Sequence, residues 1–181
     1  MTDNATPANT WIGPLLGWLI LALVATQLYF STKVATTPLW TPERAELREN
    51  HMSIGVTIAI LLIARLILWW RSRPTPRPAN LPANAQGLAV TCILALYITL
   101  LGFSITGPLQ AWSEGFRVAL WGIPLPSLAP KSYALNAFAG YLHSVFAFFI
   151  WPLALLIILV GIYQSLRYKT RILRLLPGRW T

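Results

Sequence analysis

The chain contains only two histidines, and these are the residues whose type and placement could do metal chemistry. His51 opens an apolar stretch that runs to an arginine cluster, and His143 lies within another apolar stretch. Imidazole is a common metal ligand, and a pair of histidines can hold the iron of a b-type haem. Zinc is less favoured, because two histidines without a nearby Cys, Asp or Glu in the membrane do not complete a tetrahedral site.

The elements that carry these histidines are predicted to be membrane-spanning helices. The chain is 56% hydrophobic and 10% charged, and about 20 apolar residues suffice for a helix to cross a bilayer. Four such stretches are present, at residues 11–30, 50–70, 87–112 and 133–166. The sequence therefore predicts an all-α fold, an integral membrane four-helix bundle, as a single domain over residues 1–181.

The distribution of charge predicts how this bundle is oriented. Of the Lys and Arg residues outside the spans, eight lie after the second and fourth spans and five lie in the two opposite loops. Because Lys and Arg are retained in the cytoplasm, both termini are expected there, with loops 31–49 and 113–132 outside. The net charge of +9 is thus explained by membrane topology and does not indicate nucleic acid.

In this topology both histidines lie in the outer half of the bundle, where they could share a ligand. Gly55 follows His51 by four residues and Gly140 precedes His143 by three, so each glycine shares a helix face with its histidine and leaves room for a flat group. Two simpler interpretations remain open. His51 could be an interfacial residue bonded to water, and His143 a polar link between helices.

The chain resembles the bacterial cytochrome b561 family, four-helix membrane proteins with b-type haem, in the spacing of His51, Gly55 and Arg65 at offsets of four and fourteen. Further segments that resemble this family are TGPLQAWSEGFRVALWGIPLP (106–126), AGYLH (139–143) and RILRLLP (171–177). The resemblance covers nearly the whole chain. It implies a bacterial inner-membrane protein that carries electrons.

The chain also departs from the family pattern. Typical members bind two haems and have further histidines in the first, fourth and sometimes third helices. Here the corresponding positions hold Gly17, Ile157, Val90 and Ile93. The resemblance therefore implies a variant with one haem b, held near the outer face by His51 and His143.

Several basic residues are candidate neighbours of such a haem. Arg48, one turn before His51, and Arg117 and Lys131 in the second outer loop could bind the haem propionates. Solvated loop charges near lipid headgroups are the alternative for each. Arg65 is expected to be structural, with its side chain extending to the inner headgroups.

The function expected from the resemblance is electron transfer within the lipid membrane. The donor would be a redox protein at the outer face or superoxide, and the acceptor would be ubiquinone or another redox partner, as in a quinone-linked oxidoreductase. The alternatives are a haemless structural or assembly subunit and the membrane anchor of a reductase or dehydrogenase complex. A monomer and a homodimer are both compatible with the sequence.

Overall fold

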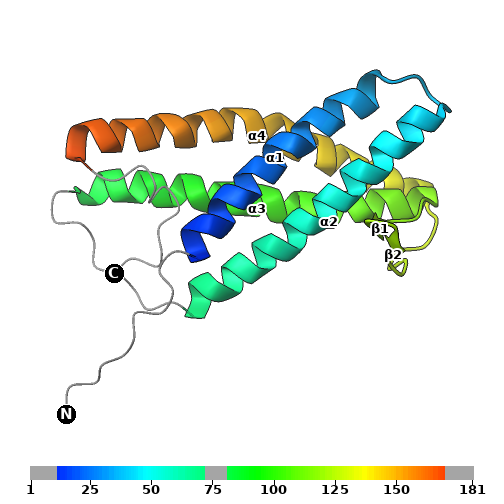
Figure 1. The fold of residues 1–181 in the computed structure, drawn as a ribbon, viewed down its shortest axis with the longest axis horizontal. Helices are drawn as coiled ribbons and strands as arrows, with labels where there is room; N and C mark the ends of the chain where they lie inside the picture. Colours follow the sequence, from blue (N-terminus) through cyan, green and yellow to red (C-terminus); the bar gives the residue numbers. More distant parts are fainter. Residues whose placement is uncertain (1–11, 72–80, 170–181) are drawn as a thin grey trace, which may run out of the picture.

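The computed structural model describes residues 12–71 and 81–169 of the chain (Figure 1). Its elements are α1 (Ile12–Thr36), α2 (Pro42–Arg71), α3 (Ala83–Glu114), β1 (Ala119–Leu120), β2 (Ile123–Pro124) and α4 (Tyr133–Tyr168). All four helices are long and apolar enough to cross a membrane. The predicted all-α, four-helix membrane bundle is therefore confirmed, whereas the cytoplasmic placement of the termini stays a prediction.

The helices extend beyond the predicted spans at the end that carries the α1–α2 connection. We call this end of the bundle the outer end. Helix α1 continues to Thr36 and α2 already begins at Pro42, so the expected loop 31–49 is reduced to a connection of a few residues. The segment ERAELRE that opens α2 is rich in strong helix formers, and proline suits the first position of a helix. Its charges therefore lie on a helix and not in a loop.

The connection between α3 and α4 is anchored at both of its ends. Gly115 ends α3 with a φ of 99°, and its N–H bonds the carbonyl oxygens of Ala111 and Trp112. This left-handed conformation carries no steric penalty in glycine. Ser132 caps α4, because its hydroxyl accepts a hydrogen bond from the backbone N–H of Leu135 at 3.3 Å. Between these caps the chain forms the hairpin of β1 and β2.

The bundle consists of two helix pairs. Helices α3 and α4 share the most extensive interface, α1 packs along α2, and α2 also contacts α3. In Figure 1 the pair α1–α2 crosses the pair α3–α4 obliquely. Buried aliphatic residues from all four helices form the core where the pairs meet: Ile20, Ile54, Ile58, Leu62, Leu100 and Ile150.

The expectation that Arg65 extends to the inner headgroups is wrong. Its side chain is 5% exposed, its Nε donates to the Tyr97 hydroxyl at 2.7 Å, and its Nη1 donates to the Gly13 carbonyl oxygen. A buried guanidinium needs acceptors for its N–H groups, and here α3 and α1 supply them within reach. Arg65 therefore links three helices instead of reaching the membrane surface.

Candidate functional site

The two histidines lie close together in the outer half of the bundle, with their rings nearly perpendicular. The ring centroids of His51, on α2, and His143, on α4, are 6.4 Å apart, with the ring planes at 72° to each other. Metal–imidazole bonds are about 2 Å long, so two imidazoles on opposite sides of one metal have centroids about 6 Å apart once the ring radii are added. The separation of the two rings therefore fits bis-imidazole ligation.

The hydrogen bonds of His143 indicate which of its nitrogens is available as a ligand. Thr106 on α3 donates its single hydroxyl proton to the Gly102 carbonyl oxygen at 2.7 Å, and the same oxygen lies 3.1 Å from His143 Nδ1. A hydroxyl that has donated its proton can only accept, so we infer that Nδ1 of His143 carries a proton. The lone pair is then on Nε2, as expected for a metal ligand whose second nitrogen is held by a neighbouring group.

Aromatic and small residues enclose His143. The Phe103 ring lies edge-on to the imidazole, with 4.9 Å between centroids, and it also packs against Phe146. A Cβ at Gly107 would lie 3.2 Å from Cε1 of His143, and a Cβ at Gly102 would overlap the Phe146 ring. The small residues of α3 thus allow the His143 face of α4 to pack closely against α3.

His51 has a different neighbour, Gln27 on α1. The side-chain nitrogen of Gln27 lies 3.2 Å from Nε2 of His51. Two atoms of this pair, Gln27 Oε1 and His51 Nδ1, are buried without a hydrogen-bond partner among the described residues. Buried polar atoms without partners are uncommon, so this half of the site has unused hydrogen-bonding capacity in the described structure.

The two predicted glycines lie beside the histidines, but side-chain amides fill the space next to them. A Cβ at Gly55 would lie 3.2 Å from Nε2 of Gln27, and a Cβ at Gly140 would lie 2.8 Å from Nε2 of Gln110. Both obstacles are flexible glutamine side chains and not backbone. These two side chains occupy the space that was predicted for a flat group, so the room beside the glycines stays a prediction.

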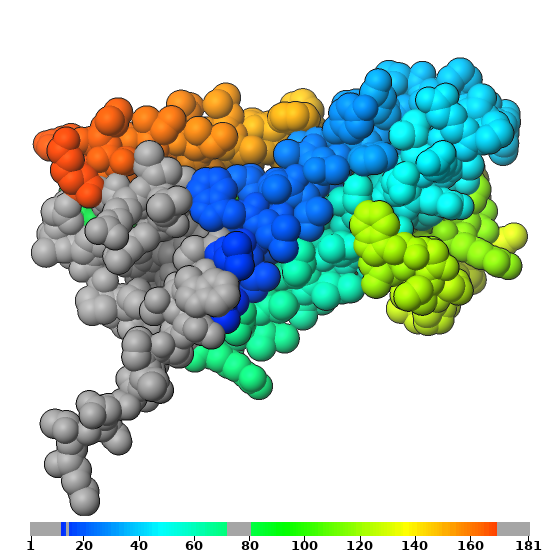
Figure 2. All heavy atoms as spheres, in the orientation of Figure 1, coloured from blue at the N-terminus to red at the C-terminus, as the bar shows by residue number. Residues whose placement is uncertain are grey.

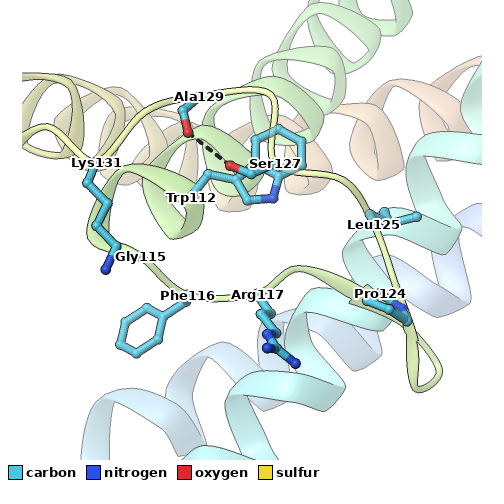
Figure 3. Close-up of a pocket in the computed structure, with 9 residues that line it drawn as sticks. All are labelled: Trp112, Gly115, Phe116, Arg117, Pro124, Leu125, Ser127, Ala129 and Lys131. Carbon is cyan, nitrogen blue, oxygen red and sulfur yellow. Dashed lines mark hydrogen bonds between the residues drawn. The ribbon is translucent and has the colours of Figure 1, made fainter.

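The three predicted basic residues gather around Phe116 at the outer end. The Arg48 guanidinium stacks on the Phe116 ring at 3.6 Å, and its Nε is buried without a partner among the described residues. Arg117 and Lys131 line a cavity of about 290 Å³ together with Phe116 and Trp112 (Figure 3). No carboxylate belongs to the described residues that line this cavity.

Sequence reasoning missed several of these neighbours. Gln27 and Thr106 are polar residues inside apolar spans, which is itself a signal of a functional position. The buried indole Nε1 of Trp112 has no partner in the described part of the chain, and the Trp112 ring lines the cavity beside Phe116. The sequence offered no signal for the role of Phe116.

Comparison with known proteins decides the family. The family model described as prokaryotic cytochrome b561 matches residues 15–178. The chain belongs to this family. The predicted resemblance is thereby confirmed, and with it a multi-pass protein of the bacterial inner membrane, from a family whose name implies b-type haem.

This cytochrome b561 family member is also similar to a named bacterial protein. It is 30% identical over 122 residues to cytochrome b561 homolog 2 of Escherichia coli (strain K12). The match covers 66% of the chain and 62% of that protein, so the chain spans less than two thirds of this relative. No solved structure matches the chain.

The residues of the site fit the haem that the family implies. The separation of the imidazoles suits a shared metal, and Gly107 leaves space beside the His143 ring. Buried N–H donors without partners at Arg48 and Trp112 lie at the outer end, where acidic groups of a haem could accept from them.

Proposed function

We propose that this chain is a one-haem membrane cytochrome whose haem b is held by His51 and His143 near the outer face. The observation that carries the proposal is the 6.4 Å separation of the two imidazole centroids. When bound, the haem would supply a one-electron ferric/ferrous couple, and the two histidines would be its protein ligands. The function is then outer-sphere electron transfer and not chemistry on a substrate bound to iron.

A single haem is supported by what fills the rest of the bundle. The chain has no third histidine, so it cannot form a second bis-histidine pair. Below the histidines the helices meet through the aliphatic core around Ile58, Leu62 and Ile150. Replacing a buried cofactor by packed aliphatic side chains keeps the interior dense and its polar groups satisfied.

The protein groups that would bind the haem propionates are Arg48, Arg117 and Lys131. Arg48 offers a buried Nε–H without a described partner, and Arg117 and Lys131 flank a cavity free of carboxylates. Trp112 adds an indole N–H to this set. Charge-assisted hydrogen bonds of this kind are among the stronger polar contacts in proteins.

The position of the site favours electron exchange at the outer side of the membrane. No second redox centre is evident in the described helices to relay electrons to the inner side, so donor and acceptor must both reach the outer half of the bundle. A redox protein or superoxide, which loses one electron to become dioxygen, is a suitable donor. Membrane ubiquinone is a suitable acceptor because it reaches the bundle from the lipid.

The first test is the absorption spectrum of the purified protein and of His143→Ala. We expect a b-type α-band on reduction, one haem per chain by the pyridine haemochrome assay, and loss of most of the haem in His143→Ala. Ser144→Ala is the matched control, because Ser144 is exposed and its hydroxyl bonds only its own helix at Gly140.

Three results would each contradict a part of the proposal. Unchanged haem content in His143→Ala would show that the ligand assignment is wrong. Two haems per chain would exclude the one-haem reading. No α-band from wild-type protein produced with ample haem would favour the haemless structural subunit or membrane anchor, with both histidines serving as packing residues.

A further inference from the structure

The hairpin between α3 and α4 folds back along the bundle and does not extend away from its outer end. Ser53 of α2 donates its hydroxyl proton to the Ala119 carbonyl oxygen at 3.1 Å and accepts from the Trp121 N–H at 3.1 Å. The Trp121 indole Nε1 donates to Thr57 Oγ1, also at 3.1 Å. In Figure 2 this yellow-green segment lies against cyan α2. The hairpin tip is therefore bonded to α2 at Ser53 and Thr57, which lie further from the outer end of the bundle than His51.

The depth of the contact can be estimated from helix geometry. A helix needs about 20 residues to cross the hydrocarbon, and α2 ends at Trp70 and Arg71. Counting about 20 residues back from this end places the outer hydrocarbon boundary near His51. Thr57 is six residues further in, or about 9 Å along the helix axis. The Trp121 ring is therefore at the level of the outer leaflet.

The composition of the loop suits this position. Residues 118–130 contain no Asp, Glu, Lys or Arg, and this uncharged segment is bounded by Arg117 and Lys131. Its tip presents Trp121 and Ile123 outward, with 59% and 66% of their surfaces exposed. A charge-free apolar tip between two cations matches a hydrocarbon layer beneath a phosphate layer.

The polar backbone of the hairpin is also largely satisfied within the protein. The strands pair Leu120 with Ile123, the Leu125 N–H bonds the Val118 carbonyl oxygen at 2.9 Å, and Ser53 serves both an acceptor and a donor of the turn. Non-helical backbone is tolerated at membrane depth only where it is buried against protein or lines a water-filled cavity, so that its polar groups are satisfied. The side of the hairpin that packs on α2 meets this requirement through the two hydrogen bonds of Ser53.

We propose that the hairpin 119–124 is a re-entrant wedge that inserts Trp121 and Ile123 into the outer leaflet of the bilayer. Arg117 and Lys131 lie at the level of the lipid phosphates and set the depth of insertion. The partner of this surface is the lipid bilayer. The inference does not depend on the haem, because every contact that carries it is between the loop and α2.

Spin labels on single cysteines in lipid nanodiscs would test the proposal. The background is Cys92→Ser, which removes the one native cysteine, and the labelled variants are Ile123→Cys, Ile60→Cys and Glu46→Cys. Ile60 is 51% exposed on the membrane-spanning part of α2, and Glu46 is exposed on its polar outer part. A spin label that collides often with oxygen lies in lipid, and a label that collides often with a water-soluble nickel complex lies in water.

We expect the label at Ile123 to match that at Ile60, with high oxygen and low nickel accessibility. Nickel accessibility equal to that at Glu46 would overturn the proposal, because it would place the tip in water. Low accessibility to both reagents would also overturn it and would point to a protein covering the hairpin, either a second copy or a partner.

A measurement without labels keeps the proposal testable if a cysteine variant fails to fold. In nanodiscs made with brominated lipids, the fluorescence difference between wild type and Trp121→Phe isolates the emission of Trp121. We expect shallow bromine positions on the acyl chains to quench this emission strongly. An emission from Trp121 that brominated lipids leave unchanged would contradict insertion.

Discussion

At the residue scale, the reduction potential of the candidate site is expected to depend on a single hydroxyl group, that of Thr106. Its oxygen accepts from His143 Nδ1 only because its own proton is given to the Gly102 carbonyl oxygen. A proton held in this way gives the imidazole more anionic character, which stabilises ferric iron more than ferrous iron. The hydroxyl is thus expected to lower the reduction potential of the bound haem.

We predict that Thr106→Val raises this potential. The substitution keeps the shape of the side chain and removes the acceptor. If about 1 kcal/mol of hydrogen-bond energy is specific to the oxidised state, the one-electron potential rises by about 40 mV. A spectroelectrochemical titration measures the shift.

Thr99→Val is the control for this titration. Thr99 is buried on the same helix, and its hydroxyl donates to its own helix at the Ala95 carbonyl oxygen, as Thr106 does at Gly102. Thr99 has no described contact with either histidine, so the reduction potential of the haem in Thr99→Val should equal that in the wild type. Equal shifts in the two variants would mean that Thr106 acts only through packing.

At the scale of the elements, Arg65 joins α1, α2 and α3 on the side of the core away from the histidines. The guanidinium bonds Tyr97 on α3 and the Gly13 carbonyl oxygen on α1. In a bundle whose pairs cross obliquely, such a link fixes the two pairs relative to each other. It contributes to stability chiefly because breaking it leaves a buried charge poorly satisfied.

We predict that Tyr97→Phe destabilises the bundle by about 1–3 kcal/mol, because the Arg65 N–H loses its acceptor in an apolar environment. Thermal unfolding in detergent, followed by circular dichroism, measures the effect as a lower Tm. Tyr141→Phe is the control, since the Tyr141 side chain is 68% exposed. If both variants unfold at the same temperature as the wild type, the bond to Tyr97 does not stabilise the fold.

At the scale of the whole molecule, the proposed site is asymmetric across the membrane. Both histidines lie in the outer half, and the described helices continue inward through aliphatic packing. Electron transfer between centres requires short separations, and the proposal includes no second centre. The two faces of the membrane should therefore differ in their access to the haem.

We predict that a membrane-impermeant reductant reduces the haem rapidly only from the side that carries the α3–α4 connection. Stopped-flow absorbance on vesicles of defined orientation measures the rate, and vesicles of the opposite orientation are the matched control. Equal rates from both sides in sealed vesicles would exclude a single haem near the outer end.

The sequence by itself determined the four spans, the pairing of two histidines on one side of the bundle and the family. These properties are local or additive, since a bilayer requires about 20 apolar residues per helix and flanking charge orients the spans. The presence of only two histidines could likewise be read directly from the chain.

Only the tertiary structure decided what surrounds each functional side chain. His51 meets Gln27 from 24 residues away, His143 meets Thr106 from 37, Arg65 meets Tyr97 from 32, and Trp121 meets Ser53 from 68. Such contacts depend on how each helix is rotated and crossed against its neighbours, which many side chains set together. The periodicity of nearly uniform apolar helices does not encode that rotation, so the burial of Arg65 and the return of the hairpin could not be predicted.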